Sequence, residues 1–561
     1  MDIKLDVASH MNEVLKGDLN LETCLSLVET PKNKEHGDLA FPCFTLAKLW
    51  KQSPQKIAVT LADQLKDERY EDVKAIGPYV NFFLDKKSIS ERVMNTILTD
   101  QHQYGTLSLG HGENIAIDMS SPNIAKPFSM GHLRSTVIGA SIANIIKKCG
   151  YTPVKINHIG DWGTQFGKLI VAYKAWGNEA KVKKSPISEL LKLYIIFHEK
   201  AETELELEQQ GRDWFKKLED GDEEATKLWK WFKEESLKEF EKIYELLGIQ
   251  FDSFNGEAFY NDKMAEVIEI IENSGLLVED QGAMVVKLEE EGLTPCLIKK
   301  SDGATLYVTR DLSAALYRYR TYDFAKAVYV VGNEQSLHFK QLKAVLKKLG
   351  FDWADDISHV PFGMIMKDGK KMSTRKGRVV LLEEVLAESI ELARKNIENK
   401  NPDLNNKDEV ARQVGVGAVI FNDLKNDRMN NIEFSLEDIL KFEGETGPYL
   451  QYTNARAHSI LRKAFTPASA SAGLSDEYSF DIVKHLLAFP SVIERSFKKM
   501  EPSVIAKYLI DLAQSFNRYY GHIRILENDS ELQNRLALIK SITIVLEEGM
   551  HLLGMEAPQE M

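Results

Sequence analysis

The spacing of apolar residues between positions 114 and 146 predicts a strand, a turn and a helix in direct succession. "NIAIDMS" (114–120) alternates apolar and polar residues, as a half-buried strand does. Downstream, apolar residues recur at helical spacing at Leu133, Val137, Ile138, Ile142, Ile145 and Ile146. The segment "SSPNIAKPFSMGH" (120–132) lies between them and contains the prolines and serines of a turn.

Similar patterns divide the first two thirds of the chain. Helical patterns and a Gly-Pro turn at "AIGPYVNFF" precede "YGTLSLGHGEN" (104–114), which we interpret as a linker. Short apolar runs then alternate with helices such as "HFKQLKAVLKKLG" (338–350). These runs are "VKINHI", "TLYVT", "AVYVVG" and "VPFGMIM". Such alternation predicts a parallel sheet.

Two further regions are predicted to be helical. Between about 170 and 292, opposite charges at helical spacing indicate solvated helices inserted into the α/β region. After the Asn-rich connector at 396–409 almost no strand pattern occurs. One helical stripe there consists of Ile505, Tyr508, Leu509, Leu512 and Phe516. The last third is therefore predicted to be a helix bundle.

Composition limits the classes of protein to consider. A chain of 561 residues with 43% hydrophobic and 28% charged residues predicts two to four soluble domains. No apolar run is long enough to span a membrane, and the N-terminus lacks a signal-peptide core, so we expect a cytoplasmic protein. Cys24, Cys43, Cys149 and Cys296 form no C-x-x-C pair and are expected to be buried. The net charge of −13 disfavours a surface that coats nucleic acid but is compatible with a local basic groove.

The turn before the predicted helix has the features of a phosphate-binding site. A helix N-terminus at the carboxyl edge of a parallel sheet presents unpaired N–H groups to an anion. Gly131 permits a close approach of the backbone, His132 can donate to a phosphate oxygen, and Lys126 adds a cation. A Gly-His pair alone favours a structural role, so a second element is needed.

That second element is the basic segment "MKDGKKMSTRKGRVV" (366–380). Alone, it is equally consistent with a solvated surface loop. Together, the turn and the basic loop match what nucleotidyl transfer requires, which is one group for the nucleotide and another for the departing pyrophosphate. The sequence contains no G-x-x-x-x-G-K-[ST] loop, which disfavours a P-loop ATPase.

These segments resemble the class I aminoacyl-tRNA synthetases, and within them the arginyl-tRNA synthetases of the bacterial type. "SMGH" resembles the His-x-Gly-His signature, with Ser129 at the first histidine, and "KMSTR" (371–375) resembles the second signature. Thr374 and Arg375 stand where the general class pattern has lysine then serine. The match continues through "NHIGDWGTQFG", "LYVTRDLSAALYRY", "FEGETGPYLQYTNARAHSI" and "GMEAPQEM". It therefore spans nearly the whole chain.

The resemblance implies a fold and a domain order. We expect an α/β, Rossmann-type parallel-sheet catalytic domain at 109–395, with a helical insertion at about 170–292. An α+β, tRNA-binding N-terminal domain would precede it at 1–108, and an all-α, anticodon-binding helix bundle would follow at 396–561.

The resemblance also implies roles for the two signature segments. The catalytic residues implied are Lys126, Ser129, His132 and Lys371. The ATP-binding residues implied are Gly131, His132, Lys370, Lys371, Met372, Ser373 and Arg375. Ser129 cannot carry a positive charge, so a charge-stabilising role would pass to His132, Lys126 or the basic loop. Any of Lys370, Lys371, Arg375 and Lys376 could take the place of the missing lysine.

Arginine as substrate gives an independent expectation, since a planar guanidinium is best matched by carboxylates. Asp118, Glu257 and Asp311 supply acids near the expected sheet edge. We place Asp311 at a strand-to-helix junction, where an ordinary helix N-cap is the alternative. Asp118 is expected to orient the turn. The resemblance implies arginine contacts at Asn123 for the amino-acid end, Glu257 for the α-amino group, and Tyr307, Asp311 and Gln335 for the guanidinium.

The implied activity is that of an arginine–tRNA ligase, with ATP, arginine and tRNA(Arg) as substrates and tRNA required for the first step. Mg²⁺ is expected with the nucleotide, with no metal held by protein ligands, and a monomer is expected. RNA contacts are expected at Tyr520 and Arg524, and at Tyr79 and Asn81, while core packing is favoured for Phe516. A small-molecule nucleotidyltransferase and a non-catalytic RNA-binding relative are the alternatives.

Overall fold

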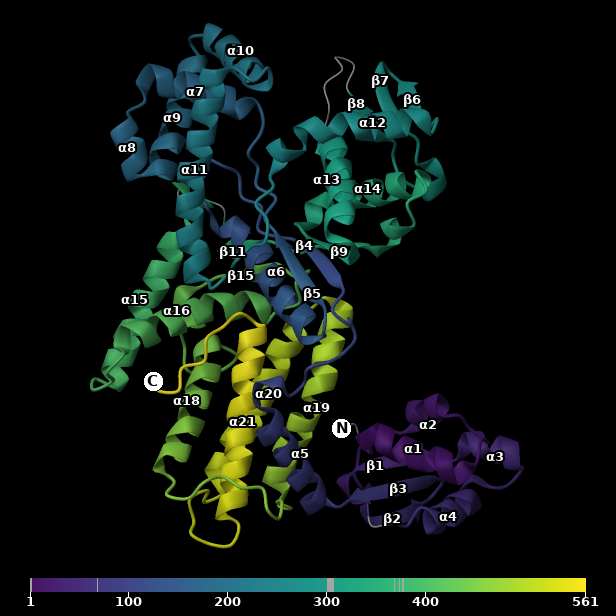
Figure 1. The fold of residues 1–561 in the computed structure, drawn as a ribbon. Helices are drawn as coiled ribbons and strands as arrows, with labels where there is room; N and C mark the ends of the chain where they lie inside the picture. Colours follow the sequence, from purple (N-terminus) through teal and green to yellow (C-terminus); the bar gives the residue numbers. More distant parts are fainter. Residues whose placement is uncertain (1–2, 68, 300–306, 368, 373, 376–377) are drawn as a thin grey trace. The chain divides into compact units, whose positions relative to one another are not determined.

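The computed structural model describes residues 3–67, 69–299, 307–367, 369–372, 374–375 and 378–561 (Figure 1). The contacts divide the chain into two compact units. The first contains residues up to 105 together with 453–492 and 508–548, and the second contains 106–452, 493–507 and 549–561. The chain therefore crosses between the units several times, within the helices of its last third.

The N-terminal part of the first unit is a small α+β module. Its antiparallel sheet has the strand order β1-β3-β2, and β3 pairs with both neighbours. The strands are β1 (Leu39–Pro42), β2 (Tyr70–Ile76) and β3 (Tyr79–Leu84). The helices are α1 (Ile3–Leu15), α2 (Leu21–Leu27), α3 (Phe44–Trp50), α4 (Pro54–Gln64) and α5 (Lys86–Asp100). The α+β class predicted for this region is confirmed.

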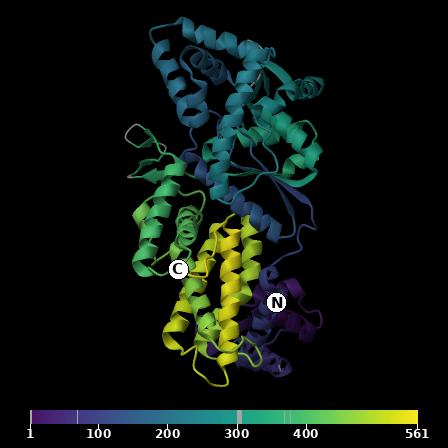
Figure 2. The same ribbon diagram turned by 60° about the vertical axis from the view of Figure 1, so that its left-hand side comes forward.

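The C-terminal part of the chain is a bundle of long helices, drawn in yellow-green to yellow in Figure 2. They are α18 (Gly447–Lys463), α19 (Glu477–Lys499), α20 (Ser503–His522) and α21 (Leu532–Leu552). Hydrogen bonds join them within the first unit: Ser515 to Asp481 at 3.0 Å, and His458 with Glu547 at 2.6 Å. The predicted apolar stripe of α20 is confirmed, because all five of its residues are buried.

The second unit is built on a four-stranded parallel sheet with the order β10-β9-β4-β5. The strands are β4 (Asn114–Asp118), β5 (Thr152–Ile156), β9 (Phe324–Val330) and β10 (Ile357–Val360). Helix α6 (Met130–Lys148) connects β4 to β5. The predicted strand, turn and helix between 114 and 146 are confirmed, as is the parallel sheet.

The insertion between β5 and β9 is only partly helical. Five helices come first: α7 (Thr164–Trp176), α8 (Glu179–Lys184), α9 (Pro186–Ala201), α10 (Glu206–Glu219) and α11 (Glu223–Leu246). After α12 (Met264–Asn273), the strands β6 (Leu277–Asp280), β7 (Ala283–Val286) and β8 (Cys296–Lys299) form an antiparallel sheet. The prediction of helices up to 292 was wrong from 277 onward, because the short strands carry too few residues to show a clear alternation.

One predicted strand is helical in its described part, and its first two residues, Thr305 and Leu306, lie outside the described residues. "TLYVT" (305–309) was predicted to be extended, but Tyr307, Val308 and Thr309 begin helix α13 (Tyr307–Tyr322). The buried residues Val308, Leu312, Ala315 and Leu316 recur at helical spacing and pack beneath the parallel sheet. Packing of this stripe therefore outweighs the local preference of β-branched and aromatic residues for strands.

The remaining elements of the second unit follow β9. Helix α14 (Ser336–Lys348) agrees with the prediction for 338–350. Four short strands then follow along the basic segment: β11 (Ile365–Lys367), β12 (Lys370–Lys371), β13 (Thr374–Arg375) and β14 (Arg378–Val379). Helices α15 (Leu382–Lys400) and α16 (Lys407–Leu424), strand β15 (Ile432–Glu433) and helix α17 (Leu436–Ile439) complete it.

Two sequence expectations concern burial. All four cysteines are unpaired thiols and all are buried, as predicted. Among the described residues, no helix combines the length and the apolar character that crossing a lipid bilayer requires.

Candidate functional site

The strand order places the turn after β4 where ligands bind in open parallel sheets. The chain leaves β4 through α6 to β5 on one side, while β9 lies on the other side, so the strand order reverses beside β4, and ligands are expected beyond the carboxyl ends of β4 and β9. Ser135 of α6 donates to the carbonyl of Val330, the last residue of β9, at 2.6 Å. The N–H of Ser120 in turn donates to Ser135 Oγ at 2.9 Å. These two hydrogen bonds fix the turn beside the carboxyl end of β9.

The backbone of the turn is strained. Ser120, Ser121 and Ala125 have φ values of 73°, 52° and 58°, in the left-handed region that non-glycine residues avoid. Neighbouring side chains hold this conformation: Asn157 Oδ1 accepts from the N–H of Ser121 at 3.1 Å, and Tyr244 bonds Ser120 Oγ at 2.8 Å. Strain that the surroundings enforce in this way is typical of ligand-binding segments.

Ser129 and His132 form the N-terminal cap of α6. Ser129 is the N-cap residue, and its backbone N–H donates to His132 Nδ1 at 3.1 Å. Because an amide N–H can only donate, Nδ1 is an acceptor and the neutral ring carries its proton on Nε2. Burial, followed by the charge of Lys126, lowers the pKa of His132, which keeps the imidazole neutral at pH 7. Nε2–H therefore remains as a hydrogen-bond donor for a ligand.

The second signature segment is joined directly to this turn. The N–H of Met130 donates to the carbonyl of Val380 at 3.1 Å, and the N–H of Leu382 donates to the carbonyl of Phe128 at 2.9 Å. Ser129 and Leu381 form an antiparallel bridge between these two bonds. This bridge and its two flanking bonds join the turn to the end of the basic segment, about 250 residues later in the sequence. A nucleotide that contacts both segments would require them to lie this close together.

The base of the basic loop is also fixed. Strand β12 pairs antiparallel with β11, and the N–H of Met372 donates to the carbonyl of Ile365 at 2.8 Å. Met372 is buried, with 6% of its surface exposed. Ser373 lies outside the described residues, as do the side chains of Lys370, Lys371 and Arg375.

Asp311 lies inside α13, so its predicted place at a strand-to-helix junction was wrong and it is not an N-cap. His338 of α14 bonds its Oδ2 at 2.6 Å, and His158 Nε2 lies 3.9 Å from its Oδ1. Burial opposes ionisation, but the hydrogen bond from His338 and the charges of His158 and His338 outweigh it, so the pKa of Asp311 lies below its usual range. Asp311 is therefore a carboxylate at neutral pH.

Two other predicted arginine contacts stand one turn away from this pair. Tyr307 precedes Asp311 by four residues on α13, and 69% of its surface is exposed. Gln335 is exposed and precedes His338 by three residues, at the start of α14. Tyr307 therefore lies one helical turn before Asp311, and Gln335 lies at the N-cap of the helix that carries His338, the partner of Asp311.

Glu257 is a carboxyl group with an unusual protonation state. It is the first residue of the 3-10 helix Glu257–Lys263, and its N–H donates to the carbonyl of Ile159 at 3.1 Å. Burial raises its pKa to about 7; Arg310 lowers it, while the charges of Asp161 and Asp311 raise it further. A cation placed beside Glu257 would restore its charge.

Asn123 is exposed and lies against the loop that leads to Glu257. It forms a parallel bridge with Gly160, and the N–H of Ile124 donates to the Gly160 carbonyl at 3.0 Å. A Cβ atom on Gly160 would lie 2.1 Å from Asn123 Oδ1. The glycine is therefore needed for this close approach.

Sequence reasoning missed a buried chain of charged groups behind these acids. Arg318 pairs with Asp118 at 2.7 Å, and both side chains are less than 10% exposed. Arg318 Nη2 lies 3.4 Å from His158 Nδ1, which connects this pair to Asp311. Asp118 also accepts from Ser121 Oγ at 3.0 Å, which confirms its expected role in orienting the turn. The signal available in the sequence was one charged residue within each apolar pattern, Asp118 in β4 and Arg318 in α13.

The predicted RNA contacts differ in exposure. Tyr520 is 47% exposed and Arg524 is exposed, and together with Ile460 and Lys463 they line a shallow pocket of about 480 Å³. Phe516 is fully buried, so core packing is confirmed for it.

The predicted contacts in the N-terminal module are less favourable. Tyr79 is half-buried and packs edge-on against Phe44. Asn81 is only 2% exposed and its amide donates to the carbonyl of His36. This burial disfavours an RNA contact at Asn81, which stays a prediction.

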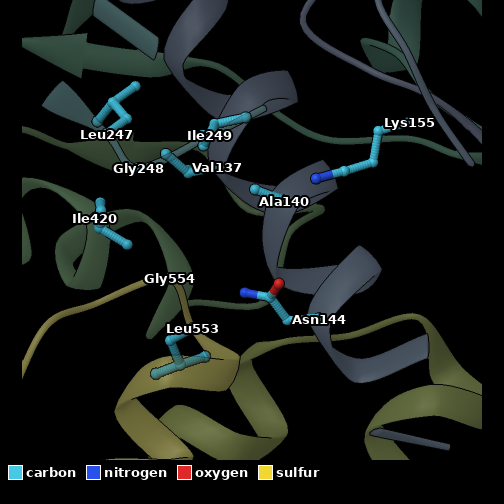
Figure 3. A pocket seen from close by; sticks show the side chains of 10 residues that line it. All are labelled: Val137, Ala140, Asn144, Lys155, Leu247, Gly248, Ile249, Ile420, Leu553 and Gly554. Carbon is cyan, nitrogen blue, oxygen red and sulfur yellow. The ribbon is translucent and has the colours of Figure 1, made fainter. Parts of the chain in front are cut away.

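A separate cavity lies on another face of α6 (Figure 3). Its lining includes Val137 and Ala140 of α6, Ile420 of α16, and Leu553 near the C-terminus. Its volume is about 50 Å³, whereas pockets for drug-sized ligands measure roughly 300–1,000 Å³. None of the signature residues lines it.

Comparison with protein families accounts for nearly the whole chain. The model for the catalytic domain of class I tRNA synthetases (R) matches residues 93–436. The model for the arginyl tRNA synthetase N-terminal domain matches residues 1–84, and that for the DALR anticodon binding domain matches 450–561. The first of these alone covers more than half of the chain.

Individual proteins match over their full length. An arginine–tRNA ligase of an Exiguobacterium species is 60% identical over 561 residues, and arginine–tRNA ligase 2 of Bacillus anthracis is 61% identical over 562 residues, each covering 100% of both chains. Among solved structures, Thermus thermophilus arginyl-tRNA synthetase is 25% identical, covers 100% of both chains and has a TM-score of 0.80. Plasmodium falciparum arginyl-tRNA synthetase is also 25% identical with a TM-score of 0.80, covering 100% of this chain and 99% of its own.

Proposed function

The chain belongs to the class I arginyl-tRNA synthetases, and on that premise we propose that it activates L-arginine with ATP and transfers it to tRNA(Arg). The observation that carries this proposal is the backbone junction between the turn at 128–130 and the segment at 380–382. It joins the two signature segments, which would bind the nucleotide, and the acids Asp311 and Glu257 lie on elements that follow the turn in the sequence.

We propose that the acids and amides select arginine. The ionised Asp311 would receive the guanidinium, with Tyr307 and Gln335 beside it. Glu257 would pair with the α-ammonium group, and Asn123 would contact the amino-acid end near the carboxylate. Two acids fixed on different elements match the two cationic ends of arginine, which leaves the carboxylate directed towards the turn.

The activation step joins this carboxylate to ATP. The carboxylate oxygen attacks the α-phosphorus, a P–O bond forms, and the bond to the departing pyrophosphate breaks. His132 Nε2–H and the α6 N-terminus at Gly131 would donate to phosphate oxygens as charge develops. Ser129 keeps the imidazole in the donating tautomer rather than supplying charge. Lys126 and the basic loop with Lys370, Lys371, Met372, Ser373 and Arg375 would bind the outer phosphates.

In the second step the terminal adenosine of the tRNA attacks the mixed anhydride through a 2′- or 3′-hydroxyl. AMP leaves, and no covalent bond to the enzyme forms. The exposed Tyr520 and Arg524 would contact the RNA at the helix bundle by base stacking and phosphate pairing, and Tyr79 would do so at the N-terminal module. We propose that bound tRNA is required already for activation, as the family resemblance implies.

Three finer assignments accompany the proposal. We propose that Mg²⁺ arrives as its complex with ATP rather than in a site built of protein side chains. We propose that the enzyme acts as a monomer in the cytoplasm, where protein synthesis supplies its substrates. The division into domains at 1–108, 109–395 and 396–561 is proposed on the sequence patterns.

An exchange assay tests the proposed function. With tRNA(Arg) present, we expect arginine-dependent exchange of pyrophosphate into ATP, and no exchange when the tRNA is omitted. Lysine and citrulline should be discriminated against by a factor on the order of 10⁴, because each leaves buried polar groups of the arginine site unpaired. Exchange with another amino acid but not with arginine would contradict the specificity. Exchange without RNA would contradict the tRNA requirement, and a lack of exchange with any amino acid would favour the non-catalytic alternative.

The protonation of Glu257 predicts a pH dependence of arginine binding. Its pKa of about 7 means that below pH 7 the carboxyl is protonated and cannot pair with the α-ammonium. The KM for arginine should therefore rise about tenfold per pH unit below about pH 7 and level off above it. The KM should be measured by exchange at saturating ATP and tRNA across this range.

The Glu257→Gln variant is the matched control, since glutamine has the same shape without a titrating proton. Its KM should be higher than that of the wild type at pH 8 and should lose the step near pH 7. Burial lowers the pKa of both His132 and His158, so neither imidazole titrates at that midpoint. The same step in wild type and Glu257→Gln would show that another group binds the amino end.

A further inference from the structure

One face of α11 contacts the site at several points, although the helix belongs to the insertion. Figure 1 shows α11 extending from the other insertion helices towards the centre of the unit. Trp229, Lys233 and Ser236 are spaced four and three residues apart, so they lie on one face. Ser236 Oγ accepts from the N–H of Ala125 in the strained turn at 3.2 Å. The other two residues contact Asp161.

Asp161 lies at the centre of these contacts and is fully buried. Lys233 Nζ donates to its Oδ2 at 2.7 Å, and Trp229 Nε1 donates to its backbone carbonyl at 2.8 Å. The N–H of Ala258 donates to its Oδ1 at 2.8 Å. One carboxylate oxygen of Asp161 thus bonds Lys233 of the insertion helix α11, and the other bonds the segment that carries Glu257. Among the described residues, Lys233 is the cation that forms an ion pair with it.

We propose that Lys233 is a positioning residue of the arginine site, which neutralises Asp161 and so allows Glu257 to receive the substrate's amino group as a carboxylate. This inference rests on the proposed function, because it assigns Glu257 to the α-ammonium group. Lys233 does not touch the substrate. It acts through Asp161, whose position and charge it fixes.

The physical reason is the repulsion between two carboxylates in one buried site. The groups that act on Glu257 are Asp161, Asp311, Arg310 and the N–H of Trp162; both aspartates raise its pKa, whereas Arg310 and the N–H lower it. Without Lys233, the negative charge of Asp161 is unbalanced. That charge repels the carboxylate form of Glu257, so Glu257 must lose its proton at a higher pH. Arginine binding, which needs Glu257 as a carboxylate, should follow that higher value.

The test is the pH profile of the arginine KM in Lys233→Met. We expect its midpoint to move up by about one pH unit and the KM at pH 7 to rise about fivefold. The kcat at saturating arginine and pH 8.5 should stay within about threefold of the wild type, because His132 and the basic loop are untouched. Lys233→Arg keeps the charge and should keep the midpoint. A merely structural role would change stability and KM without moving the midpoint.

Lys242→Met is the matched control. It removes the same charge from the same helix, where Lys242 forms an exposed pair with Glu239, and its profile should equal that of the wild type. If Lys233→Met folds poorly, the Asp161→Asn background supplies the measurement. With no charge at position 161, adding Lys233→Met should leave the midpoint where it is in Asp161→Asn alone. A further upward movement in that background would overturn the proposal.

The inference and the proposed function fail in different ways. Identical profiles in wild type and Glu257→Gln would reject the role of Glu257 itself. A step near pH 7 that is lost in Glu257→Gln but unmoved in Lys233→Met would leave the proposed function intact and reject the role of Lys233.

Discussion

Replacement of His132 by alanine is expected to lower the rate of arginine activation by about 10²- to 10³-fold. The reason is that Nε2–H is a fixed donor at the N-terminus of α6, held in that tautomer by the N–H of Ser129. A preorganised donor aimed at developing phosphate charge stabilises the transition state more than the ground state. The loss should therefore fall on kcat, measured by single-turnover formation of the adenylate, while the KM for arginine changes little.

His132→Asn separates this role from that of the helix cap. Asparagine keeps an acceptor near the position of Nδ1, so Ser129 can still be capped, but it has no donor at the position of Nε2. We expect wild-type thermal stability together with nearly the full loss of activity. Near-normal turnover in either variant would show that the turn is a scaffold.

Asp311→Asn should have the second large effect, on specificity. Removing one partner of a buried charge pair costs about 2–5 kcal/mol, so kcat/KM for arginine should fall by about 30- to 4,000-fold. Citrulline, which has no charge on its side chain, should lose much less. The arginine-to-citrulline ratio of kcat/KM, measured by pyrophosphate exchange with tRNA, should therefore collapse in this variant.

Asp262→Asn is the control for Asp311→Asn. It neutralises an acid in the neighbouring segment that is 79% exposed and pairs only with the adjacent Lys263 among the described residues. Exposed pairs of this kind contribute little, so its kinetics should equal those of the wild type. An unchanged arginine-to-citrulline ratio of kcat/KM in Asp311→Asn would mean that residues other than Asp311 bind the guanidinium.

The elements that the sequence predicts best are those with long, regular patterns. Helices α6, α14 and α20 each carry several turns of apolar spacing, and each was predicted within a few residues of its bounds. The region 277–299 was harder, because strands of four residues do not establish a period. Helix α13 was misassigned at its start because Tyr307 and Val308 favour strands locally, whereas the packing of Leu312 and Leu316 fixes the helix.

The residues of the site also divide into those that the sequence could predict and those that it could not. The signature turn and the basic loop are local in sequence, so their motifs could be recognised and the structure joins them. The pairs that tune the acids are not local: Lys233 lies 72 residues from Asp161, and Arg318 lies far from Asp118 in sequence. A single sequence carries no mark of such pairings, since a lysine on a charged helix is usually solvated. Only the fold shows that Lys233 is instead paired with the buried Asp161.

The most direct test of this account is a crystal structure of the enzyme with arginine and a non-hydrolysable ATP analogue. The account predicts the guanidinium on Asp311, the α-ammonium on Glu257 and the α-phosphate next to His132 Nε2, with the outer phosphates on the loop at 370–378. Arginine bound away from Asp311, or phosphates that contact neither the turn at 128–132 nor that loop, would contradict it.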